Sequence, residues 1–125
     1  MLYHINRNAT WNADSFFAPA CGLGELSLDT NIDGQQCLMP MAGTLSLLFL
    51  HSRNNAGDST ERFTVYKNGA ATALSAIVVN GTKLGSDLVN TVAIVAGDLI
   101  SVYYDAGASG ALNKIALAFV FTPAP

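Results

Sequence analysis

The residues best able to do chemistry in this chain are its two histidines and its serines. His4 and His51 lie far apart in the sequence, and neither has a second histidine at the spacing that zinc sites use. No Gly-x-Ser-x-Gly motif is present, so nothing indicates a serine nucleophile held on a strand-turn-helix elbow. These patterns favour neither a metal site nor nucleophilic catalysis.

The acidic residues also show no catalytic spacing. Asp98 and Asp105 flank one expected strand and would lie ~23 Å apart along it, too far for a carboxylate pair acting on one bond. Asp58, Glu61 and Asp87 fall on expected loops or strand ends, where solvated carboxylates are the usual case. No Asp-x-Asp-x-Asp-Gly calcium loop occurs. The sequence therefore predicts a protein that is not an enzyme and uses no cofactor or metal.

The two cysteines, Cys21 and Cys37, stand sixteen positions apart. A secreted disulfide scaffold would carry more cysteines, and a metal site would pair them at shorter spacing. The pattern favours two reduced, buried thiols that pack as small apolar side chains. A disulfide between neighbouring strands is the alternative.

The overall composition is apolar and poor in charge. Hydrophobic residues make up 50% of the 125 residues and charged residues 12%, against a usual charged fraction of ~25%. One domain of this length does not need so much apolar material inside, so we expect the surplus on contacts between subunits. A net charge of −3 argues against a nucleic-acid partner. No stretch approaches the ~20 apolar residues of a membrane helix, and the start of the chain lacks a signal-peptide core.

Two central segments show the local patterns of β-strands. Residues 44–50 form a short apolar run, and residues 61–67 alternate, with Phe63 and Val65 on one side. The polar residues 51–60 between them read as a surface loop. Asn68-Gly69 supplies the two positive φ angles that a type I′ hairpin turn requires.

The rest of the chain repeats this pattern of short strands and turns. Further strands are expected at 23–28, 35–39, 73–79, 87–95, 99–104 and 113–122. Turns recur every 8 to 12 residues or so, and no long segment has a helical period. The fold prediction is all-β: a jelly-roll β-sandwich of about eight strands, with a short extended N-terminal arm.

The last expected strand, 113–122, is apolar on both faces. A strand of this kind is covered on both sides, so one face belongs to the core and the other meets another chain. We therefore expect a homotrimer. The residues expected near its threefold contact are Leu117, Phe119, Phe121 and Tyr103.

The N-terminal residues differ in pattern from the rest of the chain. We therefore divide the chain into an N-terminal arm, residues 1–21, and a jelly-roll domain, residues 22–125. The arm carries Tyr3, Trp11, Phe16 and Phe17 without a period of 2 or 3.6. Aromatic side chains in such a segment favour docking on a neighbour or a larger surface. The alternative is an extended arm that packs on its own domain.

Three segments carry a family resemblance: residues 39–48 (MPMAGTLSLL), 63–74 (FTVYKNGAATAL) and 95–102 (VAGDLISV). Together they resemble the jelly-roll module of trimeric tumour-necrosis-factor-like and complement-like heads, which occur in phage structural proteins and bacterial collagen-like surface proteins. The resemblance covers roughly residues 22–122. Its marks come from turn chemistry and strand packing, and they include no active site.

With no collagen repeat and no fibre shaft, the chain is most similar to phage capsid decoration (cement) proteins. That resemblance implies a homotrimer on the outer surface of the virion head, made in the host cytoplasm. It would bind the major capsid protein and stabilise the shell without catalysis, nucleic acid or membrane. The alternative is a receptor- or glycan-binding head of a phage fibre or spike or of a bacterial surface protein. In that case Tyr66, Tyr103 and Tyr104 would form a sugar-binding platform, although strand tyrosines are more often sheet or interface residues with the hydroxyl at water.

Overall fold

The computed structural model describes the backbone of residues 2–11, 15–17, 32, 35–55, 60–79, 81–106 and 112–125. Side chains are described for 32, 35–52, 60–79, 81–106 and 115–125. Within these ranges the chain forms ten β-strands. The first five are β1 (Leu2–Trp11), β2 (Ser15–Phe17), β3 (Cys37–Leu38), β4 (Gly43–Asn55) and β5 (Glu61–Lys67). The others are β6 (Ala70–Val78), β7 (Leu84–Asp87), β8 (Val92–Ile94), β9 (Leu99–Asp105) and β10 (Leu112–Pro123).

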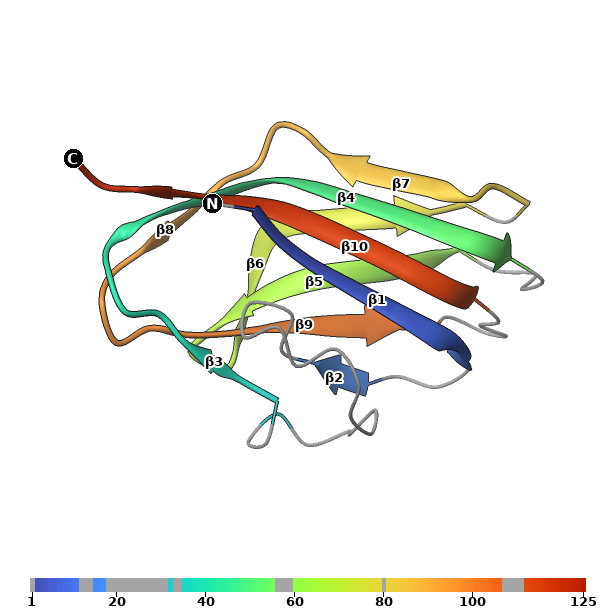
Figure 1. Ribbon diagram of the computed structural model, residues 1–125, viewed down its shortest axis with the longest axis horizontal. Helices are drawn as coiled ribbons and strands as arrows, with labels where there is room; N and C mark the ends of the chain where they lie inside the picture. Colours follow the sequence, from blue (N-terminus) through green and yellow to red (C-terminus); the bar gives the residue numbers. More distant parts are fainter. Residues whose placement is uncertain are drawn as a thin grey trace.

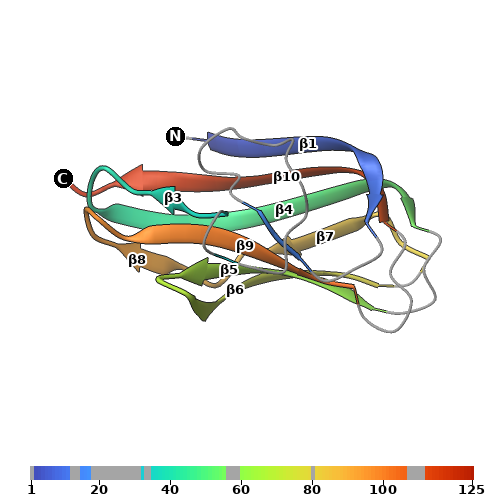
Figure 2. The same cartoon turned by 90° about the horizontal axis from the view of Figure 1, so that it is seen from below.

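The strands make two antiparallel sheets that pack face to face as a sandwich (Figures 1 and 2). Sheet 1 has the order β1-β10-β4-β7, and β8 also pairs with β4. Sheet 2 has the order β2-β9-β5-β6, and β3 also pairs with β9. β7 and β8 pair with different stretches of β4, as β2 and β3 do with β9, so each sheet is four strands wide. The predicted all-β sandwich is confirmed.

The core lies between the sheets and results from alternation along the strands. On β5, Phe63 and Val65 are fully buried and the intervening side chains turn outward, as their spacing predicts. On β10, alternate side chains from Ile115 to Phe121 are buried in the same way. The ring of Phe63 meets that of Tyr104 at a centroid distance of 4.9 Å, which joins β5 to β9. Burial of these side chains is the main stabilising contribution.

A β-bulge in β4 changes which residues of that strand face the core. Leu45 is buried, but two residues further on Leu47 is exposed, and burial resumes at Leu48 and Leu50. The register against β10 shifts between Ala118 and Val120, where β4 carries one extra residue. The apolar run 44–50 therefore contributes Leu45, Leu48 and Leu50 to the core. Without the extra residue, a strand that buries Leu45 would also bury Leu47 and would turn Leu48 and Leu50 outward.

The predicted turns have the expected backbone geometry. Asn68 and Gly69 have φ angles of 51° and 81°, and Lys67 pairs with Ala70 across them, as a two-residue type I′ hairpin requires. Gly97, in the turn between β8 and β9, has φ 93°.

Two predicted boundaries were wrong. The expected loop at 51–60 begins later, because β4 continues to Asn55 and pairs with β10 along that length. Of the single strand expected at 87–95, only Asp87, at the end of β7, and Val92–Ile94, in β8, lie in strands. The chain turns between them because Asp87 accepts hydrogen bonds from the backbone N–H groups of Val89 and Asn90.

Of the two alternatives for the N-terminal segment, the backbone agrees with an extended segment that packs on its own domain. Its backbone forms β1, along β10, and β2, along β9, so both sheets include it (Figure 1). Tyr3 lies opposite Phe119 in the register, and Phe16 opposite Tyr103. Long-range pairing supplied these strands, since the sequence there has no period of its own. The expected strand at 23–28 and the proposed boundary at residue 21 lie outside the described residues.

Candidate functional site

The outer face of sheet 1 is apolar where β4 and β10 lie side by side. Phe49 on β4 is 48% exposed and Leu47 is also exposed, while the neighbouring outward residues of β10 are small. We call this surface the apolar face. It consists of Leu47, Phe49, Ala116, Ala118 and Val120.

A hollow of about 580 Å³ opens in the surface of sheet 1 beside Phe49. Its walls come from β4, β6, β7 and β10 and include His51, Ile77 and Leu84. Ile77 belongs to sheet 2 but reaches the hollow because β6 lies against β7 at the edge of the sandwich. Gly85 permits that approach, since a Cβ there would collide with the backbone oxygen of Ile77.

The chemistry of the hollow is that of an apolar contact. The described residues that line it include no aspartate, glutamate, lysine or arginine, and their polar side chains are those of His51 and Ser86. The hollow lies beside the ring of Phe49, and the small side chains of Ala116 and Ala118 leave room for it. Such a surface fits an uncharged apolar group and offers little to hold a charged ligand.

One residue of the apolar face, Leu47, has a strained backbone. Leu47 has φ 53°, in the left-handed region that bulky side chains seldom occupy. A residue held there costs about 1–2 kcal/mol and persists only where the surrounding structure requires it. The strained bulge buries Leu48 and Leu50 and leaves Leu47 and Phe49 exposed.

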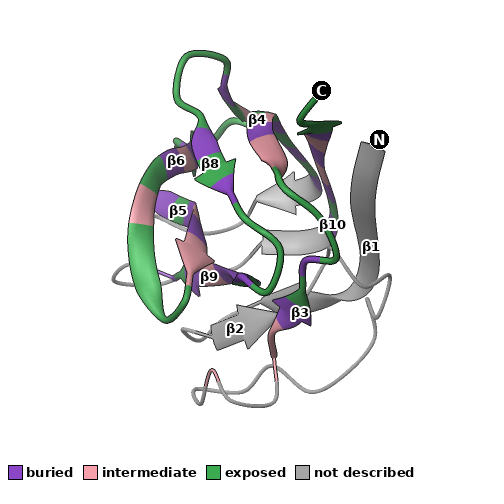
Figure 3. Cartoon of the chain, turned by 90° about the vertical axis from the view of Figure 1, so that its left-hand side faces the viewer, coloured by how far each residue is buried: buried purple, intermediate pink, exposed green. Residues whose placement is uncertain are grey.

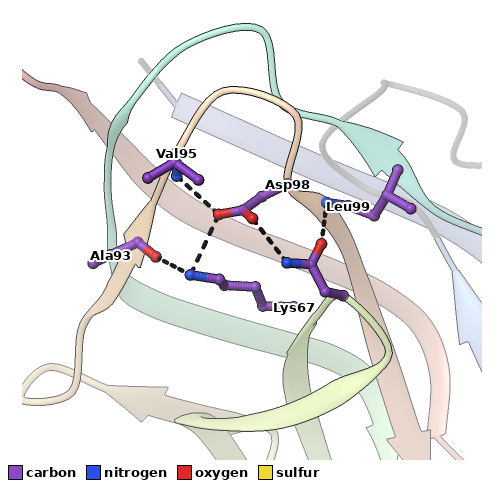
Figure 4. Close-up of polar contacts among 6 residues, drawn as sticks. Lys67, Ala93, Val95, Asp98 and Leu99 are labelled. Atoms are coloured by element: carbon purple, nitrogen blue, oxygen red, sulfur yellow. Dashed lines mark hydrogen bonds and ion pairs between the residues drawn. The ribbon is translucent and has the colours of Figure 1, made fainter.

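At one end of the sandwich, a polar network ties the β5–β6 turn to the β8–β9 turn (Figure 4). Asp98 accepts hydrogen bonds from the backbone N–H of Val95 and from Asn68 Nδ2, both at 2.8 Å. Asn68 Oδ1 in turn accepts the backbone N–H of Leu99 at 2.8 Å. Lys67 Nζ lies 3.3 Å from Asp98 Oδ2 and donates to the carbonyl of Ala93. We call this network the Asp98 clamp.

The clamp favours the ionised form of Asp98. The Val95 N–H and the Asn68 amide, followed by Lys67, lower the pKa of its carboxyl below the usual value, against a smaller opposing effect of burial. Asp98 is buried, and both of its carboxylate oxygens accept hydrogen bonds. Its part in this network is structural.

Asp87 is a second buried carboxylate with a structural role. Oδ1 accepts the backbone N–H groups of Val89 and Asn90, and Oδ2 accepts those of Ser75 and the Asn90 side chain. Burial raises the pKa of this carboxyl, but the four hydrogen bonds outweigh burial and lower it to about 2. The prediction of a solvated carboxylate was wrong here, because sequence spacing does not show which backbone donors converge on a side chain.

Glu61 is also buried, at the start of β5. Its Oε2 accepts a 2.7 Å hydrogen bond from the hydroxyl of Tyr104, which is itself fully buried. This contact overturns two predictions at once, because Glu61 is not a solvated carboxylate and Tyr104 is not part of an exposed platform. Tyr66 and Tyr103 do meet, with ring centroids 5.6 Å apart, and both are half-buried.

The residues predicted at the trimer contact lie elsewhere. Leu117, Phe119 and Phe121 are buried within the single chain, so they have no surface to offer a second copy. A strand apolar on both sides does not reveal from the sequence which side is inward, and the structure turns these three side chains toward the core. Tyr103, the fourth residue of that prediction, is half-buried on β9. Of the predicted docking residues Tyr3, Trp11, Phe16 and Phe17, only the backbone positions on β1 and β2 are described.

Cys37 is disulfide-bonded, so the prediction of a reduced thiol at this position was wrong. Its position on β3, opposite Ile100 in the register, places the bond at the margin of sheet 2. Cys21, the other cysteine of the sequence, lies outside the described residues.

The described part of the chain offers little that would bind a metal. No three histidine, cysteine or acidic side chains there come together as a metal site would need. Likewise, those residues include no helix of the length and apolarity needed to cross a membrane. His51 is exposed at the hollow, and His4 has only its backbone described.

Comparison with known proteins leaves the family open. The sequence matches no protein-family model, and no curated protein matches it either.

Proposed function

We propose that this protein is a phage capsid decoration protein, a homotrimer that binds the outer surface of the head shell and stabilises it. The observation that carries the proposal is the apolar face of sheet 1 with its adjoining hollow. A monomer exposing Phe49, Leu47 and Leu84 together on one sheet would be prone to associate. Association of three copies through this face would cover those side chains.

The order of the strands supports the jelly-roll assignment. Consecutive strands alternate between the sheets from β4 to β5, β6 to β7, β8 to β9 and β9 to β10, whereas β5 and β6 form a hairpin within one sheet. Two four-stranded sheets connected this way are typical of jelly rolls. The same order is expected from the resemblance to trimeric jelly-roll heads.

The test is direct binding to shells. Purified protein is incubated with intact capsids of the virus that encodes it, prepared without it, and the capsids are sedimented. We expect saturable cosedimentation and a higher temperature of shell disruption, because a ligand that binds only the intact shell stabilises it. Protein that stays in the supernatant at micromolar concentration would refute the capsid role.

A receptor- or glycan-binding head is the second candidate function. The ring pair Tyr66–Tyr103 on the outer face of sheet 2 favours it, since paired half-buried tyrosines can stack on a sugar ring. Binding to a glycan array that is lost in Tyr66→Ala would support this function. The buried Tyr104 is not part of that surface.

A further inference from the structure

The strand β6 forms one edge of sheet 2. In the described part of the chain the order β2-β9-β5-β6 makes it the last strand of that sheet, and it lies at the margin of the sandwich (Figure 3). The edge of a sheet presents backbone N–H and C=O groups to which another chain can add a strand. What contacts this side of β6 therefore decides whether the edge is open to a partner.

The second half of β6 has a sequence that favours pairing with other strands. The pairing with β5 is irregular between Ala71 and Ser75 and regular from Ser75 to Val78. Residues 74–79 (LSAIVV) span this regular part and contain no charged residue, proline or glycine. Proteins commonly guard an edge strand with a lysine or a proline, and uncharged segments of this kind pair with identical copies of themselves.

Two residues of β7 cover this edge. The N–H of Ser75 donates to Asp87 Oδ2 at 3.0 Å, which shows that it points away from β5. Backbone groups two residues apart in a strand point to the same side, so those of Ile77 lie on this side too. There the backbone of Gly85 approaches so closely that a Cβ would collide with the Ile77 carbonyl oxygen.

Asp87 is held in position by the turn that follows it. Its Oδ1 accepts the N–H groups of Val89 and Asn90, and the Asn90 side chain donates to Oδ2 at 2.9 Å. The carboxyl group has a pKa of about 2, so it is ionised at neutral pH. An ionised acceptor makes a stronger hydrogen bond to the Ser75 N–H than a neutral one would.

The cover that β7 gives to β6 is different from strand pairing. β7 has four residues and pairs with β4, in sheet 1. It contacts β6 across the corner of the sandwich, through the Asp87 side chain and the close approach of Gly85. We call these two contacts the edge latch.

We propose that the edge latch keeps a second copy of this chain from adding its own β6 to the edge at Ser75 to Val78. With the latch open, the partner that fits this edge is the same uncharged segment of another copy. The contact would run strand to strand through backbone hydrogen bonds, and it is therefore distinct from association through the apolar face. The proposal does not depend on the capsid role.

The test compares three variants of the full chain with the parent. Asp87→Ala opens the latch and leaves the Ser75 N–H without its acceptor. Adding Ser75→Pro to Asp87→Ala removes that N–H as well, and an edge strand tolerates proline where the N–H points away from the sheet. Asp98→Ala is the matched control, because it removes a buried carboxylate that binds a turn and an asparagine in the Asp98 clamp.

Light scattering and thioflavin T fluorescence follow each protein at micromolar concentration, well below its melting temperature. We expect Asp87→Ala to grow beyond the mass of the parent about 10-fold faster than the parent does, because its edge can accept a strand. The Asp87→Ala, Ser75→Pro double variant and Asp98→Ala should both keep the mass of the parent, although both are less stable.

Three results would overturn the proposal. Asp87→Ala that keeps the mass of the parent would show that the latch is not needed. Equal growth of Asp98→Ala would attribute the association to lost stability. Equal growth of the double variant would exclude the edge of β6 as the contact. If Asp87→Ala is insoluble on expression, the yield of soluble protein is compared instead: Ser75→Pro should restore it, and failure to do so contradicts the proposal.

Discussion

At the scale of the residue, this protein uses its buried carboxylates to hold backbone in place. Asp87 and Asp98 each collect backbone N–H donors from a turn, and both also bind an asparagine side chain. In these contacts neither carboxylate meets a second acid or a histidine. Their effect is therefore on stability, and it depends on pH.

Replacing Asp87 should remove a stabilising effect that depends on its charge. Its pKa is lowered to about 2 in the folded chain from 3.8. The stabilisation is complete above pH 3.8 and is lost as the pH falls through about 2, since protonation weakens the acceptor. Allowing for solvent screening, we expect Asp87→Asn to lower the free energy of unfolding by about 1–2 kcal/mol at pH 7.

Urea unfolding between pH 2 and pH 7 measures this effect. The difference between parent and variant should shrink toward low pH. A difference that stays constant across this range would show that the ionised carboxylate is not what stabilises the turn.

The strained Leu47 gives a prediction with an unusual sign. Glycine adopts φ 53° without steric cost, so Leu47→Gly should keep or raise chain stability, by up to about 1 kcal/mol. In an ordinary strand the same change would lower stability by about 0.5–1 kcal/mol. Thermal unfolding at low protein concentration shows whether the variant is more or less stable than the parent. Because Leu47 also belongs to the apolar face, the variant should associate more weakly than the parent.

At the scale of the element, β1 and β2 decide the status of the N-terminal segment. β1 covers the free side of β10 along its length, and β2 continues sheet 2 beside β9. β1 is therefore an edge strand of sheet 1. Removing β1 would leave the backbone N–H and C=O groups on that side of β10 without partners. The segment is part of the sandwich.

Deleting residues 1–17 should destabilise the fold. The deletion removes both β1 and β2, and with them the hydrogen bonds to β10 and β9. We expect a melting temperature lower by about 10 °C or more, or an insoluble product, since losing several kcal/mol is a large part of a domain's stability. A truncated protein that melts with the parent would return the segment to the role of an arm.

At the scale of the whole molecule, the surface proposed for self-association lies on one side of the sandwich. The apolar face and the hollow both belong to sheet 1, apart from the contribution of Ile77 on β6.

Light scattering checks the assembly. We expect about 39 kDa, three times the chain mass of 13.1 kDa, at micromolar concentration. Ala118→Asp, on the apolar face, should give a folded monomer, because the carboxylate stays solvated only when no copy covers it. Phe119→Asp should instead unfold the chain, because Phe119 is fully buried within it. A parent mass of 13.1 kDa would exclude the trimer.

The local features of the chain were predictable because they depend on near neighbours in sequence. The strand at Glu61–Lys67, its inward residues Phe63 and Val65, and the positive φ angles at Asn68-Gly69 follow from alternation and turn chemistry. These patterns sufficed for an all-β sandwich.

The candidate sites were not predictable in the same way, because long-range pairing decides them. The bulge at Leu47 decides which leucines of β4 are exposed, and no turn residue or change of period announces it in the sequence. Sequence alone determined that the chain has more apolar residues than one core needs. Tertiary structure decided where the surplus lies, since only strand register fixes which side of a two-faced strand points inward.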